Sequence, residues 1–161
     1  MDNKIEFHFR NPEESSGYLL WQVSMRWQLK MKRSLDTLNL THTQFALLAA
    51  LAWLSRTEKI VTQIDIANHS HTDRMMVSKV LRTLETKGFI HREEHSDDTR
   101  AKVISLSNSG QDILQQALKI VEETDNRFFS SLQSNTNSFN SILLRLINGN
   151  SDTESPYNRF K

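Results

Sequence analysis

The sequence contains no cysteine among its 161 residues. This absence excludes disulfides, thiolate metal sites, cysteine nucleophiles and thiol-based redox sensing together, and an intracellular protein is the simplest fit. Apolar runs are also short: none approaches the roughly 18 residues of a membrane-spanning helix, and residues 1–6 lack the cationic and apolar blocks of a signal peptide. We therefore expect a soluble, cytoplasmic protein without a membrane partner.

Glycine and proline are scarce, with four and two residues respectively. Because glycine and proline tend to end helices and strands, their scarcity favours long helices over an all-β architecture. The length of the chain fits one domain that is large enough to bury a hydrophobic core. Charge is nearly balanced: the chain has 20 lysines and arginines and 19 aspartates and glutamates, which gives a formal net charge of +1. This excludes a globally basic, histone-like protein, so any argument for nucleic-acid binding must be local.

Residues 73–88 are the most informative stretch, and at about 100° per residue they predict an amphipathic helix. One apolar stripe at helical spacing belongs to the core and holds Val77, Val80, Leu81 and Leu84. The opposite face and its flank carry cations, hydroxyls and a methionine, namely Arg74, Met75, Ser78, Lys79, Arg82 and Thr86. No acid interrupts that face before Glu85. It suits a DNA major groove, where cations meet phosphates and guanine edges and apolar groups meet thymine methyls; a solvated charged surface is the alternative.

The residues before this helix predict a second, shorter helix. A capping box of Thr62 and Asp65 opens a helix to about His69, a turn follows, and Thr72 or Asp73 caps the next helix. Two helices joined by so short a turn form the helix-turn-helix pattern, whose second helix normally enters the groove. Just before the shorter helix, the apolar segment Ile60–Val61 is long enough only for a single β-bridge.

The residues after this helix predict a β-hairpin. Gly88 is a natural helix C-terminal residue, and residues 89–94 and 101–106 are predicted strands. A hairpin directly after a helix-turn-helix makes a wing. Its tip holds Arg100, which can enter a narrow minor groove while Asp98 orients the guanidinium through a charge-assisted hydrogen bond. A surface ion pair in a turn is the alternative.

Further helices are predicted on both sides of this unit. Residues 18–38 predict a helix that is apolar on two faces. One face can pack on the core of its own chain, and the other needs a second subunit or a ligand to cover it. Thr41 and Gln44 form a capping box that opens a core helix. Residues 107–111 cap a helix to about Gln133, residues 134–137 break it, and one more amphipathic helix ends at residues 148–149. Residues 1–16 are an arm and residues 150–161 a polar tail.

Taken in order, these parts resemble the MarR family of bacterial winged helix-turn-helix regulators, named after a multiple antibiotic resistance regulator. The stretches that carry the resemblance are residues 40–45 (LTHTQF), Ile66 and Ala67, residues 77–90 (VSKVLRTLETKGFI) and residues 97–102 (DDTRAK). Each is weak alone, whereas their order and spacing across residues 18–149 are specific. The resemblance implies a mostly α fold with a small β wing, in which a winged helix-turn-helix domain at residues 40–106 is flanked by dimerisation helices at residues 17–39 and 107–149.

The resemblance also implies a function. We expect a homodimeric, sequence-specific DNA-binding transcriptional regulator, most simply a repressor, that presents two recognition helices to a pseudo-palindromic operator in double-stranded DNA. The residues expected in or over the major groove are Arg74, Met75, Ser78, Lys79 and Arg82. Arg100 would enter the minor groove with Asp98 as its support, and Lys102 would lie near a phosphate.

Members of the family often bind small aromatic or phenolic effectors between the dimerisation helices and the winged domain, and this weakens DNA binding. Trp21, Met25 and Trp53 are the candidates to line such a pocket here, although aromatic and methionine residues at helical spacing are more often core. The oxidant-sensing branch of the family uses a cysteine and is excluded. Some relatives bind zinc, but His69, His71, His91 and His95 form no ligand cluster with acids, so no metal or cofactor is expected.

Two other classes of function compete with this reading. The first is a winged-helix module that binds an acidic protein partner and has no salt-dependent affinity for any duplex. The second is an enzyme, which fits least because the sequence has no P-loop, GxGxxG, HExxH or GxSxG pattern. The acidic pairs at residues 93–94 and 97–98 fall on the predicted hairpin, where solvated charge explains them.

Overall fold

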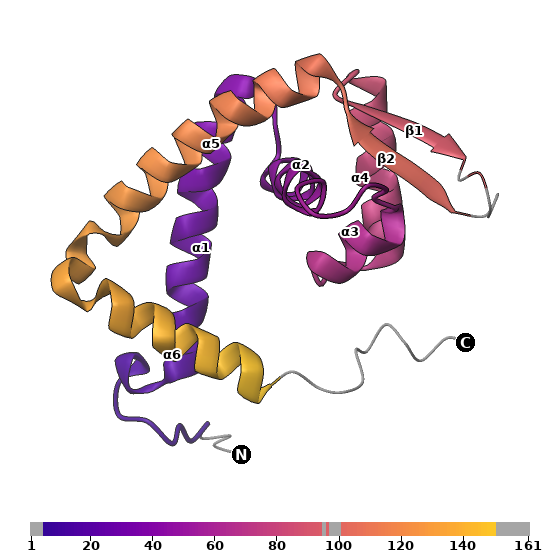
Figure 1. Cartoon of the computed structure of the whole chain (residues 1–161). Helices are drawn as coiled ribbons and strands as arrows, with labels where there is room; N and C mark the ends of the chain where they lie inside the picture. Colours follow the sequence, from indigo (N-terminus) through magenta and orange to yellow (C-terminus); the bar gives the residue numbers. More distant parts are fainter. Residues whose placement is uncertain (1–4, 95, 97–100, 151–161) are drawn as a thin grey trace.

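The computed structural model describes residues 5–94, 96 and 101–150, and its elements form two groups (Figure 1). The helical frame consists of α1 (Ser16–Leu35), α5 (Asn108–Phe129) and α6 (Thr136–Gly149). The winged unit consists of α2 (His42–Leu54), α3 (Gln63–His69), α4 (Arg74–Thr86), β1 (Ile90–Glu94) and β2 (Lys102–Leu106). Short 3-10 turns occur at η1 (Pro12–Glu14), η2 (Asp36–Leu38) and η3 (Ser130–Asn135). The predicted mostly α fold with a small β wing is confirmed.

The helices of the winged unit begin where local hydrogen bonds fix their first turns. The hydroxyl of Thr41 accepts the N–H of Gln44 at 3.2 Å, and the amide oxygen of Gln44 accepts the N–H of Thr41 at 3.1 Å. Thr62 and Asp65 form the same reciprocal box at the start of α3. Asp73 caps α4, because its Oδ1 accepts the N–H groups of residues 75 and 76 at 3.0 Å each. Both predicted capping boxes are therefore confirmed.

The core of the winged unit lies where α2, α3 and α4 meet. Three residues of the predicted α4 stripe, Val77, Leu81 and Leu84, are completely buried, and Val80 is partly buried. They belong to one apolar cluster with Leu48 and Leu51 of α2 and Ile66 of α3. Burying this stripe turns the opposite face of α4 toward solvent.

The wing follows α4 through a left-handed residue. Gly88 has a φ of 74°, and the hydrogen bonds from Gly88 N–H to Glu85 O (2.8 Å) and from Phe89 N–H to Leu84 O (3.0 Å) close the helix in a Schellman motif. Strands β1 and β2 then pair antiparallel, from Ile90 opposite Leu106 to Glu94 opposite Lys102. The bridge strand expected at Ile60 and Val61 is shifted by one residue, because Thr62 pairs with Val103.

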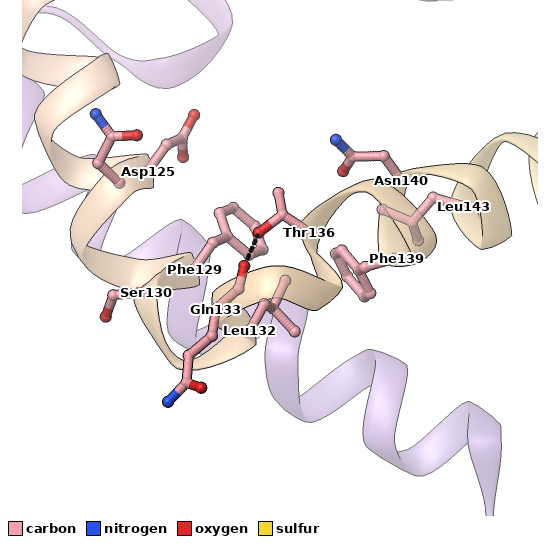
Figure 2. Close-up of a pocket in the computed structure, with 10 residues that line it drawn as sticks. Asp125, Phe129, Ser130, Leu132, Gln133, Thr136, Phe139, Asn140 and Leu143 are labelled. Atoms are coloured by element: carbon pink, nitrogen blue, oxygen red, sulfur yellow. Dashed lines mark hydrogen bonds between the residues drawn. The ribbon is translucent and has the colours of Figure 1, made fainter.

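The helical frame differs from the sequence prediction at its bend. Helix α5 ends at Phe129 rather than near Gln133, and η3 continues to Asn135. Gln133 has a φ of 49° and a ψ of −122°, and its carbonyl accepts the hydroxyl hydrogen of Thr136 at 3.1 Å (Figure 2). At the bend the chain changes direction sharply, so that α5 and α6 form an open V (Figure 1). The helix breaker is therefore a backbone kink just before the predicted break at residues 134–137.

The helical frame leaves much apolar surface exposed. Helix α6 buries none of its residues, and α1 buries only Met31 and Leu35, both in its second half. The exposed apolar residues of these two helices are Tyr18, Leu19, Leu20, Trp21, Val23, Met25, Leu29, Ile142, Leu144, Leu146 and Ile147. None of the helices in the described ranges is long and apolar enough to cross a membrane. This apolar surface has no cover within the described chain.

Candidate nucleic-acid interface

The outward face of α4 is basic and exposed. Met75 is 82% exposed, Arg74, Lys79 and Arg82 are exposed, and Ser78 is half-buried. Between described residues, ion pairs join Lys32 to Asp36, Arg92 to Glu85 and Lys102 to Glu94, and none involves a cation of this face. Thr86 is less available, because its hydroxyl donates to the carbonyl of Arg82 at 3.0 Å. The face therefore offers three cations, the hydroxyl of Ser78 and an exposed thioether to a ligand.

A largely buried arginine on β1 connects α4 to the wing. The guanidinium of Arg92 contacts the carboxylate of Glu85 on α4 at 3.3 Å and the amide oxygen of Gln63 on α3 at 3.4 Å. Its side chain is 13% exposed, and its Nε has no hydrogen-bond partner among the described residues. The sequence prediction missed Arg92. The signal was the alternation along β1, which places Arg92 on the same side as buried Ile90.

The wing itself is described only in part. The ammonium of Lys102 lies 2.9 Å from the carboxylate of Glu94 on the facing strand. This hydrogen bond and the positive charge of Lys102 lower the pKa of Glu94. Lys102, predicted to lie near a phosphate, is thus paired with an acid in the free protein. Arg100 and Asp98 lie outside the described residues.

The three effector-pocket candidates are all more than half exposed, with Trp21 at 56%, Met25 at 51% and Trp53 at 60%. Trp21 and Met25 are one turn apart on α1, whereas Trp53 lies near the end of α2 with the guanidinium of Arg56 4.8 Å from its ring centre. In the described part of the chain no ring contact joins Trp53 to Trp21.

Two surface hollows lie elsewhere, on the helical frame. The first, of about 410 Å³, sits at the bend between α5 and α6, where Phe129, Leu132 and Phe139 gather (Figure 2). The second, of about 390 Å³, is the α1–α5 hollow, which is lined by Arg26, Leu29, Lys30, Arg33, Arg127 and Phe128. The pocket candidates line neither of them.

A small polar cluster joins the helical frame to the winged unit. The indole N–H of Trp27 on α1 donates to the carboxylate of Asp125 on α5 at 2.8 Å, and the Trp27 ring meets His42 of α2 edge-on at 4.9 Å. Burial lowers the pKa of His42, and the nearby charge of Asp125 opposes this effect. Within the described ranges, no three histidine or acidic side chains are arranged to hold a metal ion.

A short helix, a tight turn, a second helix with an exposed basic face and a two-stranded hairpin together define a winged helix-turn-helix protein. The family model described as the MarR family matches residues 40–102, which cover most of the winged unit. An uncharacterized HTH-type transcriptional regulator of Bacillus subtilis, YdcH, is 41% identical over 135 residues, which are 83% of this chain and 92% of that protein. The chain belongs to the MarR family, and it is a transcriptional regulator rather than an enzyme.

Solved structures are similar across both groups of elements. The S. aureus MepR–DNA complex has a TM-score of 0.76 and 26% identity, and the match covers 84% of this chain and 98% of MepR. A mutant MarR from E. coli complexed with operator DNA has a TM-score of 0.72 and 20% identity, with 81% and 91% of the two chains covered. The similarity therefore extends from the winged unit into the helical frame.

Proposed function

We propose that this regulator is a homodimer that binds a pseudo-palindromic operator and represses transcription by covering a promoter. The observation that carries the proposal is the outer face of α4, where Arg74, Lys79 and Arg82 are exposed and form no ion pair with any described residue. An unpaired basic helix face beside a hairpin has the charge and the shape to enter a major groove. The DNA complex of the similar protein MepR supports this role.

Each side chain on the face has a chemical role in the proposal. Arg74 and Lys79 neutralise phosphates along the groove, and Arg82 binds a phosphate or the edge of a guanine. Ser78 donates or accepts one hydrogen bond. Met75, whose exposed thioether is poorly suited to water, contacts thymine methyl groups and so contributes to sequence preference.

The wing extends the interface to the minor groove. Arg100, oriented by Asp98, inserts where the groove is narrow and its potential most negative. Lys102 turns from Glu94 to a nearby phosphate. That exchange is easy because the Lys102–Glu94 pair is solvent-exposed and contributes little to stability.

The helical frame, at residues 17–39 and 107–149, is the proposed dimerisation region, and residues 40–106 form the DNA-binding domain. The support is the uncovered apolar surface of α1 and α6, which a two-fold partner would bury. A two-fold axis also sets the two α4 helices about one DNA turn apart, roughly 34–36 Å.

We also propose that a small aromatic effector relieves repression in the bacterial cytoplasm by binding at Trp21, Met25 and Trp53. The support is that these residues expose large apolar surfaces on both the helical frame and the winged unit, so that a bound ring could change how the two sit together. Loss of operator affinity on addition of an aromatic compound, abolished by Trp53→Ala, would be the expected result.

The first experiment is selection of bound duplexes from a random pool by the full-length protein at moderate salt. The expected consensus has two inverted half-sites with centres about 10–10.5 base pairs apart or a multiple of this. A consensus without inverted symmetry contradicts the dimer. No salt-dependent affinity for any duplex contradicts DNA binding and points to the protein-interaction alternative.

The second experiment measures how operator affinity depends on salt in Lys79→Ala and Arg100→Ala. Each lost phosphate contact should reduce the slope of log affinity against log salt by about 0.9. Lys119→Ala, which removes an exposed lysine of α5 outside the winged unit, is the matched control and should leave the slope unchanged. Met75→Ala should instead keep the slope and lower the preference for the selected site about five- to tenfold.

A further inference from the structure

The α1–α5 hollow is a concentration of positive charge outside the winged unit. Arg26, Lys30 and Arg33 are spaced four and three residues apart and so share one face of α1, and Arg127 of α5 completes the set. This face points away from the core, because Met31, the buried residue five positions after Arg26, is turned from it by about 140° at 100° per residue. No residue of α2, α3, α4 or the wing lines the hollow.

The four cations have no counter-charge among the residues that the structure describes. In residues 5–94, 96 and 101–150, none of the ion pairs includes Arg26, Lys30, Arg33 or Arg127. Two of the acids nearest in sequence already have other partners, because Asp36 pairs with Lys32 and Asp125 accepts the indole hydrogen of Trp27. A third, Glu123, lies one turn before Arg127 and forms no ion pair with any of the four cations. Four like charges around one concave surface attract anions strongly.

The rest of the lining is apolar. Leu29 of α1 and Phe128 of α5 contribute hydrocarbon surface between the cations. The volume of about 390 Å³ falls within the roughly 300–1,000 Å³ typical of small-molecule sites. Arginine guanidinium groups bind carboxylates and phosphates in a two-point fork, whereas a phenyl ring and a leucine favour a flat apolar body.

We propose that the α1–α5 hollow binds a small aromatic molecule that carries two negative charges, such as an aromatic dicarboxylate or an aryl phosphate. Its acidic groups bind Arg26, Arg33 and Arg127, and its ring lies against Phe128 and Leu29. This site shares no residue with the DNA-binding face of α4 or with the proposed effector residues Trp21, Met25 and Trp53. The proposal does not depend on repression, but all six lining residues lie in the proposed dimerisation region, so it requires the hollow to stay open in the dimer.

Calorimetric titration of the full-length protein with phthalate and phenyl phosphate tests the proposal. At least one of these two should bind with one molecule per chain, about tenfold or more tightly than benzoate, because each charge-assisted pair contributes roughly a factor of ten. Benzamide, which has the ring without charge, and inorganic phosphate, which has the charge without the ring, should both bind more weakly than the better aromatic dianion. If neither phthalate nor phenyl phosphate binds, or if benzamide binds equally well, the proposal is overturned.

Variants locate the site. Arg26→Gln and Arg127→Gln should each weaken binding of the aromatic dianion about tenfold, and Arg127→Lys should recover part of it. Lys32→Gln, which removes a neighbouring cation of α1 already paired with Asp36, is the matched control and should bind like the parent. Circular dichroism and the unliganded melting temperature verify that each variant folds. Unchanged binding in both arginine variants, or a changed dimer dissociation constant in place of changed ligand affinity, would show that the hollow is not this site.

Discussion

Substitution of Gly110 by alanine should test how the wing is fastened to α5. A Cβ atom at Gly110 would lie 1.9 Å from the carbonyl oxygen of Phe89 and 2.8 Å from its carbonyl carbon. The same carbonyl oxygen accepts the N–H of Ser107 at 3.1 Å, and the hydroxyl of Ser107 donates to the carbonyl of Gly88 at 2.6 Å. The methyl group would therefore push on backbone that joins α4 to the wing, not on a flexible side chain.

The size of the effect follows from these contacts. Overpacking of this kind costs about 1–3 kcal/mol, and each weakened hydrogen bond adds about 1 kcal/mol. The better helix propensity of alanine returns up to about 1 kcal/mol. We expect Gly110→Ala to lower the free energy of unfolding by about 2–4 kcal/mol, which corresponds to a melting temperature lower by roughly 4–16 °C for a chain of this length.

The other glycines are internal controls. At Gly88 a Cβ would meet nothing within 4 Å but the φ of 74° disfavours it, so Gly88→Ala should cost about 1–2 kcal/mol. At Gly17 the added Cβ would lie 4.0 Å from Ser15 Oγ, an ordinary van der Waals distance, so Gly17→Ala should be neutral or slightly stabilising. Urea denaturation followed by tryptophan fluorescence at one fixed protein concentration measures all three. A loss for Gly110→Ala smaller than that for Gly88→Ala would refute the reasoning.

Three further predictions concern the winged unit. Thr62→Ala removes the capping box of α3 and should cost about 0.5–2 kcal/mol in urea denaturation; an unchanged midpoint would contradict it. Arg92→Gln should weaken operator binding more than binding to random DNA, because it frees Glu85 of α4 from the wing, and an equal loss on both duplexes would argue against a positioning role. The lowered pKa of His42 means that the unfolded chain takes up its proton first as the pH falls below the ordinary value of 6.5. The parent should therefore lose more stability than His42→Gln between about pH 7.5 and 5.5, and parallel losses would refute this assignment.

The sequence alone determined the features that depend on neighbours along the chain. The capping boxes at Thr41 and Thr62 join residues three apart, the left-handed turn at Gly88 follows from its missing side chain, and the α4 stripe follows from helical spacing. Such interactions form between residues that the sequence already brings together, so a local pattern is enough to predict them. The exposed basic face of α4 was predictable for the same reason, since it is the remainder of the buried stripe.

Only the tertiary structure decided the contacts between distant segments. Arg92 reaches Gln63 across 29 residues, Trp27 reaches Asp125 across 98, and the close approach of Gly110 to Phe89 depends on how the wing meets α5. The α1–α5 hollow likewise exists because the helix crossing brings Arg127 beside Arg26, Lys30 and Arg33. Each of these residues carries an ordinary local signal. Which residue each of them contacts depends on how the whole chain packs, and no short stretch of sequence specifies that packing.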